Sequence, residues 1–200
     1  MSILLPQPRL PSKAVPKYLD FGADQKSGMG GAYQRLNRLG NRFALDITYA
    51  RLVPDPDGRI LGAALRRAKT EGALFPFPQP GLAIGAPGSP VVDGPGILGA
   101  LLPLRGLNPG YVVRAGQFFS IINGGRRYLH CVNEDADHVV DVSGRVTLPI
   151  HPMLRVVPAS GAVCEFAQPY IEGIVSGASI DIELTIAKSQ MPVITIIEQA

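Results

Sequence analysis

Strict alternation of apolar residues with smaller or polar ones marks the first clear element of the chain. Over residues 42–53, Phe43, Leu45, Ile47 and Tyr49 are separated by single residues that are smaller or polar. A period of two is typical of a β-strand with one buried face. The pattern therefore predicts a long strand over this segment.

Helical spacing occurs in residues 58–70, directly after an Asp-Pro-Asp-Gly turn sequence. The apolar residues that fall on one helical face are Ile60, Leu61, Ala64, Leu65 and Ala68. Arginines and a lysine take the other faces, as in an amphipathic helix. Asp57 is placed to cap the first turn and Gly72 to end the helix.

After this helix, short apolar runs alternate with turn sequences rich in Gly, Pro, Asn and Asp. The predicted strands are residues 74–78, 101–104, 111–114, 118–122, 127–132, 146–150, 153–157 and 163–166, with a closing pair at 180–186 and 193–197. Residues 81–99 are rich in Gly and Pro and are predicted as a loop or boundary. Short strands at intervals of about ten residues favour a small barrel or sandwich.

Together these elements predict a mainly β fold with one amphipathic α-helix. A β-sandwich core is assigned to residues 41–93 and 172–200 and contains the helix over 58–70. A small β-barrel-like block, residues 94–171, is expected to be inserted into that core.

The first 40 residues are predicted to form an extended arm. Pro6, Pro8, Pro11 and Pro16 interrupt regular structure, and a Gly-Met-Gly-Gly run adds flexibility. A segment of this kind buries little by itself. We therefore expect the arm either to be disordered or to lie over a neighbouring subunit.

Charge is unevenly distributed along the 200 residues. The net charge is +3, but residues 1–80 hold 12 basic and 6 acidic residues, whereas residues 81–200 hold 7 and 10. A chain that is basic at one end and acidic at the other can stack on copies of itself. Basic residues do not cluster with aromatic ones anywhere in the sequence, which disfavours a nucleic-acid-binding protein.

Composition also limits the class of protein. A hydrophobic content of 46% suffices for a buried core, and 23 Gly with 19 Pro favour a turn-rich β fold. The sequence shows neither a signal peptide nor an apolar stretch of about 18 residues, so we expect a soluble protein made in a cytoplasm. Cys131 and Cys164 lack the spacing of a metal site or redox pair and are expected to be buried, reduced thiols.

Few residues could carry catalysis. His130 and Cys131 would form a nucleophile pair, but neighbours along a strand point to opposite faces. His130, His138 and His151 match the ligand number of a catalytic zinc site, but they lie on separate predicted strands and loops. The phosphate-loop, nucleophile-elbow and dinucleotide motifs are absent from the sequence. The sequence therefore predicts a binding or assembly protein, with no catalytic residue, cofactor or metal, and not an enzyme.

Four carboxylates cluster in one predicted loop: Glu134, Asp135, Asp137 and Asp141. Clustered oxygens suit a hard cation such as calcium, but the loop lacks the glycine and terminal glutamate of a helix-loop-helix calcium site. We expect a solvated loop, or one that faces a basic partner.

Five segments of the second half follow one another in an informative order. They are Gly116–Ile121, Arg127–His130, Gly144–Ile150, Pro152–Arg155 and Gly161–Val163. This order resembles a module of bacteriophage tail proteins with a G-D-x-F/I strand, a Tyr-containing strand, a G-x-A-T-L-x-I-x-P-x-L-R segment and a G-x-x-V strand. The first half of this chain is also similar to that group of tail proteins. In it, a strand ending near Arg51 precedes the helix over Ile60–Ala68 and a Phe/Leu-rich strand at Ala73–Phe77.

Most of residues 43–200 thus resembles the distal tail proteins of bacteriophages with long, non-contractile tails. That resemblance implies a structural protein of the virion, placed at the tail tip and made in the host cytoplasm. It implies a ring, usually a hexamer, that joins the tail tube protein to the baseplate hub and other tail-tip proteins. DNA would meet the protein only in transit through the lumen, and no membrane partner is implied. The resemblance brings no catalytic residues.

Charged residues are the candidates for the subunit interface. They are Arg9, Lys13 and Lys17 in the arm, Arg59, Arg66 and Arg67 in the helix, and Glu134, Asp135 and Asp137 in the acidic loop. A closed ring needs a head-to-tail interface between two different surfaces, which an arm and opposite charges would serve.

Three alternatives stay open at this point. One is another minor tail, connector or completion protein of the virion. The second is a small hydrolase or metal-dependent enzyme around His130 and Cys131, and the third is a monomeric ligand-binding β protein.

Overall fold

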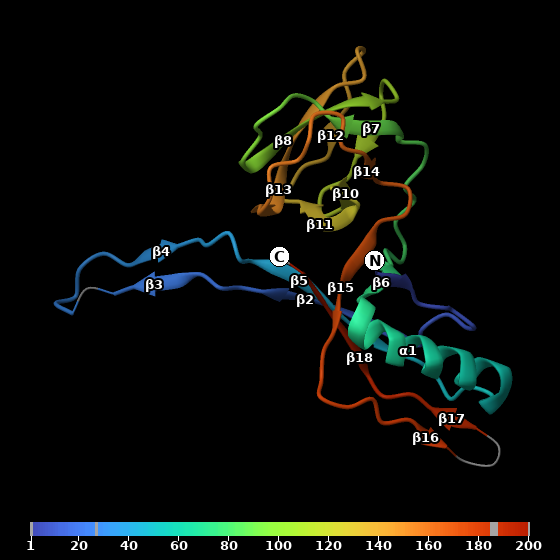
Figure 1. Cartoon of the computed structure of the whole chain (residues 1–200). Helices are drawn as coiled ribbons and strands as arrows, with labels where there is room; N and C mark the ends of the chain where they lie inside the picture. The colour runs from blue at the N-terminus through green and yellow to red at the C-terminus, as the bar shows by residue number, and fades with distance from the viewer. Residues whose placement is uncertain (1, 27, 185–187, 200) are drawn as a thin grey trace.

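The computed structural model describes residues 2–26, 28–184 and 188–199. Within them the elements are strands apart from one α-helix, α1 (Arg59–Glu71), and one π-helical turn, η1 (Pro54–Gly58), before it. The predicted mainly β fold, with one amphipathic helix and a barrel-like block, is confirmed. Figure 1 shows a barrel-like lobe at the top, a sheet with α1 below it, and an arm that projects to one side.

Six strands form the first sheet. In spatial order they are β1 (Ile3–Leu4), β6 (Ala73–Pro76), β15 (Tyr170–Val175), β18 (Ile194–Glu198), β5 (Arg42–Thr48) and β2 (Lys13–Leu19). Neighbouring strands are antiparallel except β1 and β6, which are parallel. This sheet occupies the region predicted as a β-sandwich and also takes in β1 and β2 from the predicted arm.

Six further strands form the second sheet. Their order is β14 (Cys164–Glu165), β10 (Phe118–Asn123), β11 (Arg126–Val132), β13 (Val146–Leu154), β8 (Gly99–Leu107) and β7 (Gly88–Val92). A bridge between Val91 and Val163 brings the two edges together, so the sheet nearly closes into a barrel. The chain leaves the first sheet after β6 and returns to it at β15.

Three two-stranded pairs complete the fold. They are β12 (His138–Val139) with β9 (Val112–Val113), β16 (Glu183–Leu184) with β17 (Ser189–Gln190), and β3 (Ala23–Gln25) with β4 (Gln34–Leu36). The expected pairing of residues 180–186 with 193–197 is wrong, because β18 pairs with β5 and β15 instead. Residues 185 and 186 of that predicted strand lie outside the described residues.

Outside the predicted arm, two strands of the large sheets were missed by the sequence pattern. β7 lies within residues 81–99, which were predicted as a loop, and β15 was not predicted at all. β15 contains Gly173, where a Cβ atom would overlap the carbonyl oxygen of Ile197 on β18. The glycine that weakens the strand pattern is therefore the residue that allows the two backbones to approach.

α1 confirms the predicted helix, with differences at its first turn. Leu61, Leu65 and Ala68 are buried as expected, but Ile60 is half exposed. Gly72 ends the helix at a φ of 87°, and its N–H donates to the Ala68 carbonyl, as predicted. Asp57 does not cap the helix, because η1 runs directly into α1. The carbonyls of Pro54 and Pro56 in η1 already accept the N–H of Arg59, the first residue of α1.

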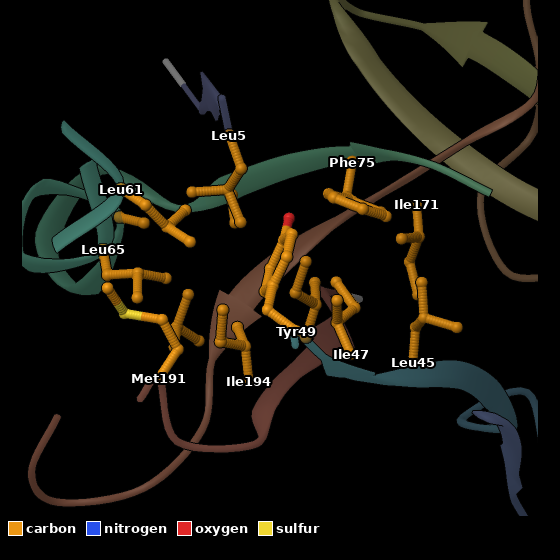
Figure 2. Packing of buried hydrophobic residues seen from close by; sticks show 14 of the residues in the cluster. Leu5, Leu45, Ile47, Tyr49, Leu61, Leu65, Phe75, Ile171, Met191 and Ile194 are labelled. Atoms are coloured by element: carbon orange, nitrogen blue, oxygen red, sulfur yellow. The ribbon is translucent and has the colours of Figure 1, made fainter. Parts of the chain in front are cut away.

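The first core lies between α1 and the first sheet. Figure 2 shows Leu61 and Leu65 of α1 close to Met191 and Ile194, with Tyr49 at the centre of the cluster. The second core fills the barrel, where the rings of Phe119 and Phe166 stack with centroids 4.5 Å apart. Burial of these side chains is the main favourable term for each lobe.

The predicted arm consists of two different parts. Its first part is built into the first sheet, because β2 pairs with β5 along seven residues and the Leu5 side chain is buried. Its second part, residues 20–40, is a long hairpin that includes β3 and β4 and projects away from both lobes (Figure 1). We call residues 20–40 the projecting hairpin.

Glu198, near the end of β18, ties the two lobes together. One carboxylate oxygen accepts the N–H of Leu129 on β11 at 2.7 Å and lies 2.6 Å from a guanidinium nitrogen of Arg155. The other accepts the N–H of Phe43 on β5 at 3.3 Å. Arg155 and Glu198 are almost completely buried, so a charge from each lobe is neutralised inside the junction.

Two more side chains of the first lobe satisfy the backbone of the barrel. Gln79 forms a pair of hydrogen bonds with the N–H and C=O of Phe118, at 2.7 and 3.2 Å. Glu172 accepts the N–H of Arg127 at 2.8 Å. Backbone N–H groups that pair with no strand would be costly to bury, so these contacts hold the barrel in one position.

Replacing Glu198 with Ala is expected to lower the free energy of unfolding by about 3–5 kcal/mol, because the buried guanidinium of Arg155 loses its counter-charge. Urea unfolding measures this effect. Glu71→Ala, which breaks an exposed pair with Arg67 on α1, should leave the unfolding midpoint unchanged. Equal effects of the two variants would contradict a central role for Glu198.

Candidate functional site

Exposed apolar side chains line the projecting hairpin. Tyr33 is 61% exposed, Leu39 54% and Phe21 48%, and Leu36 is also exposed. An isolated two-stranded hairpin is marginally stable in water, and apolar groups left in water add nothing to its stability. The hairpin therefore leaves apolar surface exposed to solvent.

Polar contacts fix the shape of the hairpin. Arg35 on β4 forms ion pairs with Asp20 and Asp24 across the two strands, and the Lys26 ammonium lies over the ring of Tyr33. At the base, the N–H of Phe21 donates to the side-chain oxygen of Asn41 at 2.7 Å. The hairpin is thus held extended by its own charges, while its apolar side chains stay uncovered.

The three predicted interface residues of the arm lie on the part that joins the first sheet. Lys17 on β2 pairs with Asp46 of β5 at 2.5 Å, which with Thr195 lowers the pKa of Asp46 in spite of its partial burial. Arg9 and Lys13 are exposed and have no charged partner within the described residues. Lys17 is therefore used inside the subunit, and the other two remain available to a partner.

The three predicted interface residues of α1 also differ in whether they have a charged partner within the subunit. Arg67 binds Glu71 through two hydrogen bonds, at 3.1 and 3.2 Å, and this contact raises the pKa of Arg67. Arg59 pairs with Asp55 at 2.6 Å. Arg66 has no such partner in the described part of the chain. Arg59 and Arg66 border a hollow of about 330 Å³ beside the segment that precedes β16, so they share one surface and Arg67 does not line it.

The acidic loop uses its carboxylates mainly to shape itself. Asp137 accepts hydrogen bonds from the Arg114 guanidinium at 2.6 Å and from the Ala115 N–H at 2.9 Å, and these contacts lower its pKa. Glu134 lies 2.5 Å from His138. Asp135 has no partner among the described residues. The described residues contain no group of three or more His, Cys, Asp or Glu that could hold a metal ion.

His130 and Cys131 point into different surroundings. His130 is 1% exposed, contacts Phe119 of the barrel core and donates from Nδ1 to the Pro152 carbonyl at 2.8 Å. Burial lowers the pKa of His130 to about 3. Cys131 packs against the first core, and burial raises its pKa to about 11. A neutral imidazole and a protonated thiol on opposite faces of β11 do not form a nucleophile pair.

A groove that the sequence did not indicate lies at the open edge of the first sheet. β1 pairs with Ala73 and Leu74 only, so the rest of β6 has no strand on that side. The groove has a volume of about 610 Å³ and is lined both by β2, at one edge of the sheet, and by β6, next to the opposite edge. Its lining is rich in proline, and Phe75, Phe77 and the exposed Leu10 contribute apolar surface. We call this the edge groove.

The edge groove could not be found from the sequence, because its residues come from three distant segments, 7–16, 75–80 and Gln168. The prolines were the available signal. In the sequence these prolines indicate interruptions of helices and strands. In the folded protein they keep β6 and β2 from pairing with a further strand.

No helix among the described residues has both the length and the apolar character needed to cross a membrane.

The buried neutral His130 makes stability depend on pH. Because its pKa is about 3 in the folded protein and near 6.5 when unfolded, stability is complete above pH 6.5 and falls as the pH drops toward 3. His130→Asn keeps a donor for the Pro152 carbonyl and removes the titration. Between pH 6.5 and 4.5 the wild-type protein should lose up to about 1.4 kcal/mol per pH unit more than the variant in urea unfolding. If the free energy of unfolding of the wild type and of the variant changed equally with pH, the result would contradict a buried, neutral His130.

The sequence matches no protein-family model and no curated protein.

Proposed function

We propose that this chain is a structural protein of a bacteriophage virion that forms a ring, with six subunits as the expected number, at the distal end of the tail. The ring would join the tail tube protein to the baseplate hub and other tail-tip proteins. The observation that carries self-assembly is the projecting hairpin with its uncovered apolar side chains. The tail assignment rests on the sequence resemblance over residues 43–200.

A ring requires that each copy offers two different surfaces, one on each side. The projecting hairpin supplies one such surface, because it extends to one side of the body and leaves the opposite side unlike it. Rigid attachment matters as well, since a floppy arm loses more entropy on binding. The seven-residue pairing of β2 with β5 provides that attachment.

The alternatives differ in how well the geometry supports them. Another minor tail or connector protein would use the same hairpin, and only its position in the virion distinguishes it. A hydrolase around His130 and Cys131 is disfavoured, since the buried His130 and the partly buried Cys131 lie on opposite faces of β11 and burial favours the neutral form of each. A monomeric ligand-binding protein leaves the exposed hairpin without a role.

Electron microscopy of negatively stained protein, with mass measurement in solution, tests the proposed function. We expect closed rings with an open centre. A protein that is monomeric at every concentration and does not bind a tail tube protein would contradict the proposal.

Shortening the projecting hairpin should abolish assembly and leave the fold intact. Replacing residues 21–40 with Gly-Gly leaves a four-residue connection between Leu19 and Arg42, which are paired neighbours on β2 and β5, and hairpins tolerate loops of this length. The expected result is a folded monomer with an unfolding midpoint near that of the wild type. Rings of unchanged mass would rule out a role of the hairpin in assembly.

A further inference from the structure

We infer that the edge groove of one copy receives the projecting hairpin of a second copy. The inference rests on the proposed self-assembly, whose surfaces it names, and it does not depend on the phage assignment. It joins two features that have no partner within the described residues: a protruding apolar hairpin and an apolar hollow.

The groove cannot be filled by the hairpin of the same chain. Lys13, Ala14 and Pro16 of β2 border the groove, whereas the hairpin begins after Leu19, at the other end of the same strand. β2 is held straight by its pairing with β5 from Lys13 to Leu19. The hairpin therefore points away from its own groove and can reach only the groove of another molecule.

The size of the hairpin agrees with a stable interface. A specific protein interface uses about 20–30 residues on each side, and the described residues of the projecting hairpin, 20–26 and 28–40, are exposed almost throughout. Buried in a neighbour, this segment would supply one side of an interface of ordinary size. The groove volume of about 610 Å³ is enough to receive several of its side chains.

The projecting hairpin and the edge groove both present apolar surface. Tyr33, Leu36 and Leu39 are exposed on the hairpin, and the exposed Leu10 and a row of prolines line the groove, with the buried Phe75 beneath them. Charge does not drive the contact, because the exposed cations Lys13 and Arg9 lie near the groove and the carboxylates of the hairpin are already paired with Arg35. Association should therefore resist salt, unlike an interface between a basic arm and the acidic loop.

Strand addition is not the mode of contact. Pro16 lies in the middle of β2, and Pro76 and Pro78 lie in and after β6. Proline lacks the N–H that a new strand would need. The geometry points to side-chain docking, in which the hairpin lays one face into the groove without extending the sheet.

The test uses two full-length variants that each destroy one surface. The groove variant carries Leu10→Asp and Pro78→Asp, and the hairpin variant carries Tyr33→Asp and Leu36→Asp; these four residues are exposed, so the fold should survive. A control variant, Leu98→Asp with Val142→Asp, places the same charges at exposed positions of the barrel, outside the groove. Circular dichroism and urea unfolding verify that all three variants fold.

Each surface variant alone should be at least tenfold weaker in self-association than the wild type by sedimentation velocity, and the control unchanged. Mixed in equal amounts, the two surface variants should form a one-to-one dimer and nothing larger, because the pair retains one intact hairpin and one intact groove. Raising NaCl from about 0.05 to about 0.5 M should weaken wild-type assembly less than threefold.

The outcomes separate this inference from the proposed function. Wild-type rings together with full assembly of the groove variant, or a mixture that stays monomeric, would overturn the pairing of hairpin and groove and leave the ring intact. A wild-type protein that never associates would overturn both. Strong loss of assembly in salt would overturn the apolar contact in favour of a charged one.

Discussion

The buried carboxylate of Glu198 is the contact on which the relation of the two lobes depends. Glu198 is the last residue of β18, and its carboxylate binds backbone groups of both sheets and the guanidinium of Arg155. Burial raises the pKa of a carboxyl group, and Arg155 with two N–H donors opposes that effect. Because an unpaired charge in this junction would be expensive, the pairing of Glu198 with Arg155 favours one arrangement of barrel and sheet.

A fixed junction gives the two-lobed body one shape, and a ring requires subunits of one shape. The hairpin leaves this body from β2, the edge strand of the same sheet. Its direction is therefore set by the first sheet, which also carries the groove lined by β2 and β6. Hairpin and groove are built on one rigid element, which is the geometry that a repeated head-to-tail contact needs.

Charged residues have a smaller part in the assembly proposed here than the uneven charge along the chain suggested. Several candidates are occupied within the subunit: Lys17 by Asp46, Arg67 by Glu71, and Asp137 by Arg114. Exposed ion pairs of this kind contribute little to stability, but they do remove those charges from use by a partner. Apolar surface at the hairpin and the edge groove, by contrast, has no partner in the described chain.

The sequence by itself determined the β class, a helix predicted over 58–70 and observed at 59–71, and the strands predicted at 118–122 and 127–132, which are β10 and β11, because these depend on local periodicity and turn residues. It also separated His130 from Cys131, since neighbours on a strand face opposite ways. Only the tertiary structure decided that β15 is a strand, that half of the arm belongs to the sheet, and that Glu198 meets Arg155. Those features depend on partners far away in the chain, and a glycine such as Gly173 or a row of prolines acquires its meaning only from the backbone that approaches it.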